Sequence, residues 1–128
     1  RHLSPQQICF IVDFVFHNKR FFESFGRRTQ SNYAVFKSSE DNEGEKYRAV
    51  NTLPKRTIEF RFFRGTLKTS TLFASIQMVL CLYLYARSND HFLHNGNNNY
   101  CINAFKKFID KKCPKYADIK KYMQERNL

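Results

Sequence analysis

The spacing of apolar residues predicts an amphipathic helix close to the start of the chain. Ser4, Pro5 and Gln7 form a helix-start signal, in which Ser4 is the N-cap, Pro5 takes the first helical position and Gln7 completes a capping box. The apolar positions at helical spacing, which predict the buried face, are Ile8, Ile11, Val12, Val15 and Phe16. We expect this helix to end at Phe22 or slightly later, with Gly26 as the stop.

An alternating pattern in the middle of the chain predicts an antiparallel hairpin. We expect strands at 47–51 and 56–63, joined by a turn at 52–55. In the second strand, Ile58, Phe60 and Phe62 share the face that we assign to the core. The other face carries Thr57, Glu59, Arg61 and Phe63. This alternation places the Glu59 carboxylate next to the Arg61 guanidinium on one face of the sheet.

Three further helices complete the expected fold. Residues 71–86 are apolar nearly all round, a pattern that fits either a central buried helix or a membrane span. Because a span needs roughly 20 residues, we expect a buried helix and no membrane association. Amphipathic patterns predict helices at 100–112 and 116–126. Together these elements predict an α+β fold over residues 1–128 as a single domain, with a small antiparallel sheet packed against the apolar helix and flanked by the other helices.

Composition adds a strong positive charge to this picture. The 128 residues include 22 Lys and Arg against 11 Asp and Glu, so the formal net charge is +11. A chain of this length excludes a two-domain enzyme, and its charge predicts attraction to polyanions such as nucleic acid or phosphorylated ligands. The cysteines are Cys9, Cys81, Cys101 and Cys113. Their wide spacing without a C-x-x-C pair favours buried free thiols in a cytoplasmic, reducing compartment over a zinc site or a disulfide framework.

The charged pair on the second strand is the strongest candidate for chemistry. Glu59 and Arg61 would lose hydration on a half-buried face, so they need partners or a ligand there. A carboxylate can ligate magnesium, and a guanidinium can hold phosphoryl oxygens through two hydrogen bonds. The structural alternative is a cross-strand ladder of ion pairs on an exposed face, and alternation by itself favours that alternative.

Three segments of the chain occur in an informative order. Residues 25–33 read FGRRTQSNY, residues 46–51 read KYRAVN, and residues 57–67 read TIEFRFFRGTL before the long apolar helix. The last segment resembles the EFR-x-F-x-GTL motif of the phage and bacterial amidoligase family, whose members are distant relatives of glutamine synthetase. The other two resemble the family's Arg-containing segment after a helix and its RY-x-A-x-N strand. The resemblance covers residues 3 to about 87.

The resemblance implies an ATP-dependent carboxylate–amine ligase on a glutamine-synthetase-like antiparallel sheet, with ATP and Mg²⁺ as cofactors. Glu59 matches the family's metal-ligating glutamate, and Arg61 matches the arginine that meets substrate or the transferred phosphate. Both are therefore candidate catalytic residues. Arg27, Arg28 and Arg64 are the candidate nucleotide-binding residues.

The chain departs from the family in one important respect. The family's earlier strands, which carry a paired-glutamate motif and a histidine, have no counterpart in this sequence. A single carboxylate such as Glu59 does not hold two or three magnesium ions against water. The sequence therefore leaves two alternatives: the C-terminal part of a longer amide-bond ligase, or a reduced descendant that is inactive alone and acts by binding.

A second hypothesis comes from the basic C-terminal third of the chain. Its lysines are Lys106, Lys107, Lys111, Lys112, Lys115, Lys120 and Lys121. They predict a stripe for a phosphate backbone, with Tyr100, Tyr116 or Tyr122 available to stack on bases. The other members of this basic stripe are Lys19, Arg20, Arg27, Arg28 and Arg126. The second hypothesis is therefore a small basic phage-type binding or inhibitor protein that acts on nucleic acid, a nucleoprotein complex or another acidic partner. The structural alternative is a solvated helix face that keeps a Phe-rich protein in solution.

Overall fold

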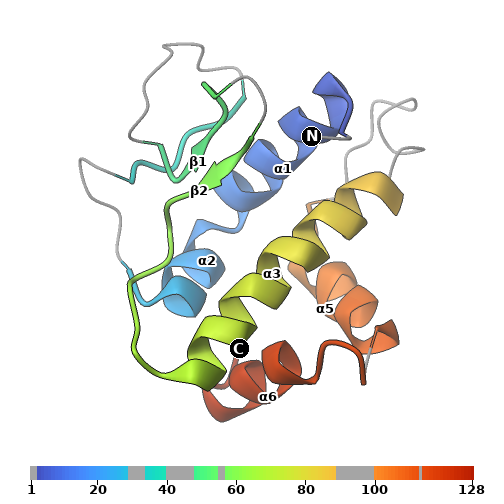
Figure 1. Cartoon of the computed structure of the whole chain (residues 1–128). Helices are drawn as coiled ribbons and strands as arrows, with labels where there is room; N and C mark the ends of the chain where they lie inside the picture. The colour runs from blue at the N-terminus through green and yellow to red at the C-terminus, as the bar shows by residue number, and fades with distance from the viewer. Residues whose placement is uncertain (1–2, 29–33, 40–47, 55–56, 89–99, 113) are drawn as a thin grey trace.

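A computed structural model describes residues 3–28, 34–39, 48–54, 57–88, 100–112 and 114–128 of the chain. Across these residues, five helices and a two-stranded antiparallel sheet form a small α+β fold (Figure 1). The elements are α1 (Pro5–His17), α2 (Lys19–Gly26), β1 (Val50–Asn51), β2 (Glu59–Phe60), α3 (Thr69–Ser88), α5 (Ile102–Lys111) and α6 (Ala117–Glu125). The expected fold class is therefore confirmed at this level.

The start of α1 has the predicted capping box. Gln7 donates its backbone N–H to Ser4 Oγ over 3.1 Å, and Ser4 donates its own to Gln7 Oε1 over 2.8 Å. The buried face differs from the predicted one, because Ile8 is half-buried and Phe16 is 37% exposed. Instead the large rings of Phe10 and Phe14 point inward, where they offer more apolar area to the core.

The single helix expected from Ser4 to beyond Phe22 is divided at Asn18. The Asn18 side-chain amide donates to the carbonyl of Phe14 over 2.9 Å and to the carbonyl of Tyr100 over 2.8 Å. Its backbone angles, φ −116° and ψ 33°, end α1 and let α2 start in a new direction. The prediction of one continuous helix is therefore wrong, because the partner that holds the break lies 82 positions away in the sequence.

The sheet is much shorter than the two predicted strands. Val50 pairs with Phe60 and Asn51 pairs with Glu59. The Arg61 N–H also donates to the carbonyl of Ala49 over 2.7 Å, but three residues later the Arg64 N–H donates to the carbonyl of Gly26 instead. The chain leaves the sheet because its hydrogen bonds pass from β1 to the end of α2. Residues 47 and 56 of the predicted strands and residue 55 of the predicted turn lie outside the described part of the chain.

The face assigned to the core is confirmed for the segment around β2. Phe62 is fully buried, while Ile58 and Phe60 are partly buried and pack against the core. The core is a cluster of aromatic rings on several elements. Phe62 meets Phe22 with ring centroids 5.1 Å apart, and Phe14 meets Phe105 at 5.2 Å. These edge-on contacts join α1, α2 and α5 to the chain after β2.

Helix α3 is the central element and packs against α1, α5 and α6. Its buried side carries residues such as Ala74, Met78, Cys81 and Tyr85. Its opposite side is exposed, so the prediction of burial all round is only half correct. With 20 residues and a mean hydropathy of 1.4, α3 is also long and apolar enough to cross a membrane, a test that core helices of soluble proteins pass as well.

The last two helices match the prediction to within about two residues at each end. Phe105 and Ile109 of α5 are buried, as are Ile119, Tyr122 and Met123 of α6.

The cysteines match the expectation of buried free thiols only in part. Cys81 is buried, and burial raises the pKa of its thiol to about 11. Cys9 and Cys101 are exposed, which corrects the expectation that such thiols are buried, and Cys113 lies outside the described residues.

We expect Gly26→Ala to destabilise the fold severely. A Cβ at position 26 would overlap the carbonyl oxygen of Phe62 and lie 2.9 Å from its carbonyl carbon. Because backbone atoms cannot rotate away, we expect a loss of at least about 3 kcal/mol in the free energy of unfolding, measured by urea denaturation. Gly65→Ala is the matched control, since a Cβ there meets nothing within 4 Å and should change stability by less than about 0.5 kcal/mol. Equal stability of the two variants would contradict this contact.

Candidate functional site

The end of α2 holds two arginines against the chain that follows β2. Arg27 ends the helix in the left-handed conformation, with φ 55°. The Arg28 N–H donates to the carbonyl of Glu23 over 3.1 Å, which closes a Schellman motif. Glycine normally takes the left-handed position, but here Gly26 lies one residue earlier, where the contact with Phe62 requires it. The predicted stop at Gly26 is therefore displaced by one residue onto an arginine, at a cost of about 1 kcal/mol.

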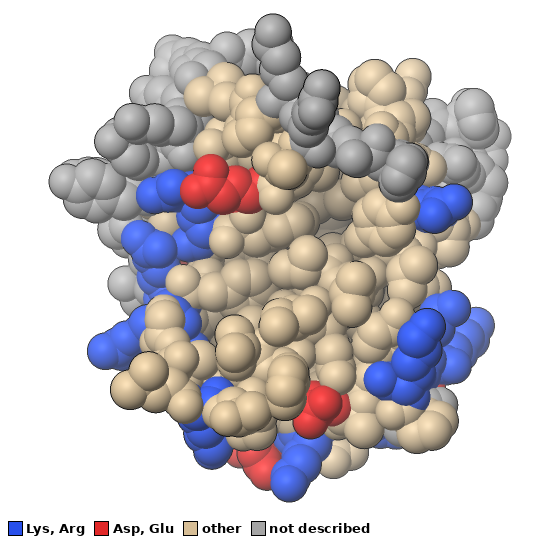
Figure 2. Space-filling view, in the orientation of Figure 1, with Lys and Arg blue, Asp and Glu red and all other residues tan. Residues whose placement is uncertain are grey.

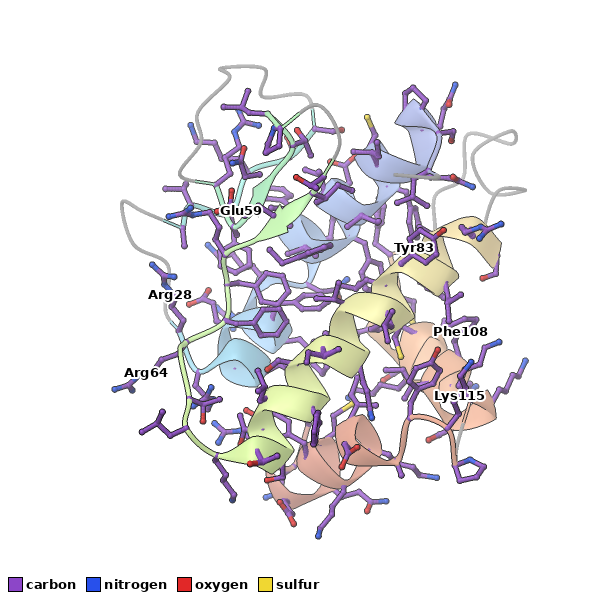
Figure 3. The ribbon with its side chains drawn as sticks, in the orientation of Figure 1. Arg28, Glu59, Arg64, Tyr83, Phe108 and Lys115 are labelled. Atoms are coloured by element: carbon purple, nitrogen blue, oxygen red, sulfur yellow. The ribbon has the colours of Figure 1, made fainter. Side chains whose placement is uncertain are left out.

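The two arginine side chains then reach across to the segment after β2. Arg27 Nη2 donates to the carbonyl of Arg64 over 2.8 Å, and Arg28 Nη1 donates to the carbonyl of Arg61 over 2.9 Å. Arg27 Nε is buried and finds no hydrogen-bond partner within the residues that the structure describes. Figure 3 shows Arg28 and Arg64 on the same side of the molecule. Thus the three predicted nucleotide-binding residues come together.

These arginines line one groove, with a volume of about 630 Å³, which we call the arginine groove. Its lining residues are Arg20, Glu23, Ser24, Arg27, Arg28, Arg64 and Arg126. A second hollow of about 470 Å³ shares Arg27 and Arg126 with it and adds Lys68, Ser70 and Thr71 from the start of α3. Five arginines thus face one carboxylate in the arginine groove. Guanidinium groups stay charged at all physiological pH values and match the geometry of phosphate oxygens.

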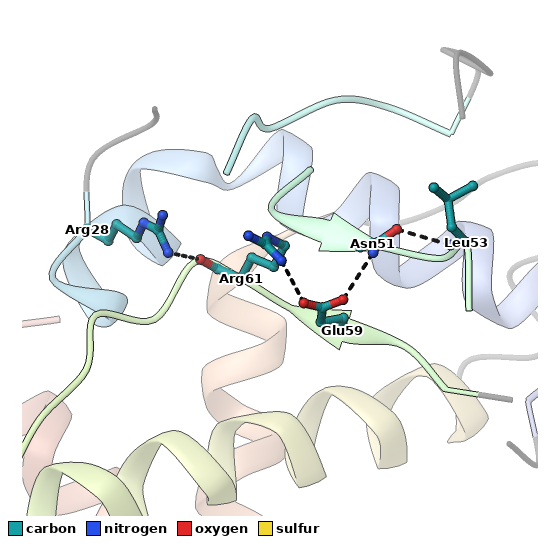
Figure 4. A network of polar contacts seen from close by, with 5 residues as sticks. All are labelled: Arg28, Asn51, Leu53, Glu59 and Arg61. Atoms are coloured by element: carbon teal, nitrogen blue, oxygen red, sulfur yellow. Dashed lines mark hydrogen bonds and ion pairs between the residues drawn. The ribbon is translucent and has the colours of Figure 1, made fainter. Parts of the chain in front are cut away.

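The Glu59–Arg61 pair lies next to this groove, as Figure 4 shows. Arg61 Nη1 and Glu59 Oε1 are 2.7 Å apart, and Asn51 Nδ2 donates to Glu59 Oε2 over 3.1 Å. Asn51 is itself buried and accepts the Leu53 N–H through Oδ1 over 3.1 Å. The hydrogen bonds from Asn51 and then Arg61 hold the pKa of Glu59 below its usual range. The side chains of Glu59 and Arg61 are 47% and 26% exposed. Their ion pair lies within one segment, and the contact across to β1 is the hydrogen bond from Asn51, so the described residues show these two contacts and not a cross-strand ladder of ion pairs.

Glu59 contributes a single carboxylate, which does not hold two or three magnesium ions against water. Each of its oxygens accepts one hydrogen bond from a neighbouring side chain and keeps a second lone pair. In addition, no group of three or more His, Cys, Asp or Glu within the described ranges could hold a metal ion. The ion pair with Glu59 holds the Arg61 side chain, and the Arg61 carbonyl accepts a hydrogen bond from Arg28. Glu59 is therefore placed to position the arginines.

The lysines of the second hypothesis lie on and between α5 and α6, mostly away from the arginine groove. In Figure 3, Lys115 lies across α3 from Arg28 and Arg64. Lys120 pairs with Asp110 over 3.7 Å, and it is the only one of the seven lysines in an ion pair within the described part of the chain. Lys106, Lys112 and Lys115 each lie over an aromatic ring of the protein, at 5.4–5.6 Å from its centre. Lys121 lines the second hollow, whereas Lys107 and Lys111 line neither that hollow nor the arginine groove.

The tyrosines expected to stack on nucleic-acid bases are engaged inside the protein. Tyr116 and Tyr122 are only 5% and 8% exposed, and the Tyr122 hydroxyl donates to the carbonyl of Phe25 over 2.7 Å. Tyr100 stacks on His17 with ring centres 4.4 Å apart. The prediction of free stacking surfaces is therefore wrong for Tyr116 and Tyr122, because both rings fill the core beside α2 and α3.

Two residues of the arginine groove, Arg20 and Arg126, were expected in the basic stripe of the second hypothesis and not among the nucleotide-binding residues. Arg20 lies seven positions before Arg27, a spacing that places both on one side of a helix and offers a signal. Arg126 follows α6 and reaches the groove only through the packing of α6 against α3. No local sequence pattern around Arg126 predicts that it lies beside Arg27 in the groove.

Comparison with known proteins gives no match: no family model matches the chain, and no curated protein or solved structure shows significant similarity to it. The proposal for its function is therefore drawn from the arginine groove and the residues around it.

We expect the stability contributed by Glu59 to depend on pH. Because the folded protein lowers the pKa of Glu59, its contribution is fully present above the ordinary glutamate pKa of about 4.3 and is lost as the pH falls through the lowered value. The wild type should therefore be more stable than Glu59→Gln at pH 7, and the difference should disappear on acidification. Urea midpoints at stepwise lower pH measure this, with Glu125→Gln as the control. A difference that grows toward acid pH would contradict the assignment.

Proposed function

We propose that this chain binds the phosphoryl groups of a nucleotide such as ATP in the arginine groove, as the phosphate-binding part of an amidoligase-like fold. The observation that carries the proposal is the convergence of Arg27, Arg28 and Arg64. Two segments that are 30 residues or more apart in sequence meet there through side-chain hydrogen bonds to main-chain carbonyls. These are the segments that resemble the amidoligase motifs.

The chemistry of the groove suits a polyphosphate. Arg27 and Arg28 are held by hydrogen bonds to main-chain carbonyls, so these two side chains lose little freedom when a ligand arrives, and each guanidinium has N–H groups beyond those used internally. A volume of about 630 Å³ lies within the usual range for small-molecule sites. The adjoining hollow adds the Lys68 ammonium and the Ser70 hydroxyl for further phosphate oxygens.

The proposed function is nucleotide binding, in which Glu59 and Arg61 position the arginines that contact the phosphates. Arginines can offset the negative charge of phosphoryl groups, but a single carboxylate such as Glu59 does not hold two or three magnesium ions against water. Amide-bond formation by an amidoligase-like protein would therefore need carboxylates beyond those that the described residues supply.

Calorimetric titration tests this proposal. We expect ATP and inorganic tripolyphosphate to bind more tightly than AMP, and we expect the binding to persist in EDTA because the arginines hold the phosphates directly. Arg64→Gln should weaken ATP binding about tenfold or more, since a charge-assisted hydrogen bond is worth about 1.5–3 kcal/mol. The control is Arg87→Gln, which removes the same charge at the far end of α3. A folded wild type without ATP binding, or an equal loss in both variants, would contradict the proposal.

A second candidate function, binding of a nucleic-acid backbone, is favoured by the α5–α6 lysines. Seven lysines on this part of the chain share a single ion pair within the described residues, so their charge is available to a polyanion. Binding of this kind would depend on phosphate charge and be independent of sequence, because the nearby tyrosine rings are buried.

Salt-dependent binding of a short DNA duplex separates the two candidates. If the lysines contact the backbone, the double variant Lys111→Glu with Lys112→Glu should weaken binding and reduce the slope of log K against log salt concentration by about one for each lost contact. Arg64→Gln should leave this binding nearly unchanged. Loss of DNA binding in Arg64→Gln with no effect of the lysine variant would exclude the second candidate and place the DNA in the arginine groove.

A further inference from the structure

The side of α3 that faces away from the core is apolar. Leu72, Phe73, Ile76 and Leu80 are each between 44% and 49% exposed. Leu72, Ile76 and Leu80 follow one another at intervals of four residues, so they form a continuous line along the helix. We call these four residues the α3 stripe. Large apolar side chains gathered in this way on a surface mark a contact site.

An apolar cavity continues the stripe toward the sheet. It has a volume of about 250 Å³ and is lined by Leu3, Ile11, Thr57, Ile58, Phe60, Val79 and Tyr83. Val79 and Tyr83 come three and seven positions after Ile76, so they lie beside the stripe on the same helix. The cavity is large enough for one apolar side chain of a partner. A hollow of this kind fits an inserted protein side chain better than it fits a flat lipid surface.

The stripe and its cavity lie between two groups of positive charge. Figure 2 shows a mostly uncharged face in the middle of the view, with Lys and Arg side chains to both sides of it and smaller groups of Asp and Glu at its upper left and lower part. Lys68 comes directly before α3 and Arg87 lies in its last turn. A second copy of this chain would bring the same charge to the same place, and its +11 net charge opposes that contact. The complementary partner has an apolar ridge with carboxylates on its flanks.

We propose that the α3 stripe binds an amphipathic helix of an acidic protein partner. The partner helix places its apolar residues on Leu72, Ile76 and Leu80 and inserts one of them into the cavity beside Tyr83. Its glutamates or aspartates then face the Lys and Arg side chains on the flanks. A line of residues four apart advances about 6 Å at each step, which matches the ridge that a second helix presents. The proposal is independent of nucleotide binding, because the stripe shares no residue with the arginine groove.

The probe for this site is a fluorescein-labelled, designed 18-residue helical peptide with leucines at helical spacing and glutamates on both flanks. A matched peptide carries lysines in place of the glutamates. Fluorescence anisotropy at fixed ionic strength measures the Kd of each peptide for the full chain. The test variant combines Ile76→Gln with Leu80→Gln. Its control is Leu53→Gln, which changes a side chain that is 51% exposed on the loop after β1. Circular dichroism confirms that each variant is folded.

We expect the glutamate peptide to bind the wild type at least about tenfold more tightly than the lysine peptide. The double variant should lose about tenfold in affinity for it, while Leu53→Gln should stay within about twofold. Absence of binding by the glutamate peptide, or an equal loss in the control, would overturn the proposal. So would sedimentation of the wild type as a dimer that the double variant converts to a monomer. Binding to phosphatidylcholine–phosphatidylglycerol vesicles that only the double variant abolishes would overturn it in favour of a membrane surface.

Discussion

The close contact between Gly26 and the backbone of Phe62 is the constraint on which the rest of the structure depends. It brings the end of α2 onto the segment after β2, where the Arg64 N–H donates to the Gly26 carbonyl over 2.7 Å. Any side chain at position 26 would separate these segments. The left-handed turn at Arg27 follows from the same contact, because glycine is used for proximity and the next residue must make the turn. The arginine groove is a consequence of this backbone arrangement.

The molecule divides its surface between charge and apolar area. The arginine groove lies on one side of α3, the α5–α6 lysines lie on the other, and the exposed stripe of α3 runs between them (Figures 2 and 3). Rings of α1 and α5 pack against Tyr85, and α6 packs along the same helix, so one side of α3 is covered while the stripe stays exposed. Positive charge on both flanks then discourages contact between identical copies, while it attracts anions of several kinds.

The sequence predicts most of the helices and the arginines of the groove, but it predicts the ends of the first helix and of the second strand less well. The capping box at Ser4 and the periodicity of α5 and α6 act over a few residues, so they can be read directly. The break at Asn18 cannot be read in this way, because half of its side-chain hydrogen bonding goes to the carbonyl of Tyr100. The second strand was predicted too long for a similar reason: its alternation continues to Phe63, but its backbone partner changes from β1 to α2.

The sequence by itself determined the start of α1, the inward side of Phe62, the basic charge and the closeness of Glu59 to Arg61. These properties depend on local sterics and on the periods of helix and strand. Only the tertiary structure decided that Arg126 joins Arg27 in one groove, that Tyr122 is buried, and which side of α3 stays exposed. Such outcomes depend on which distant segments pack together, and packing between segments leaves no periodic mark within either of them.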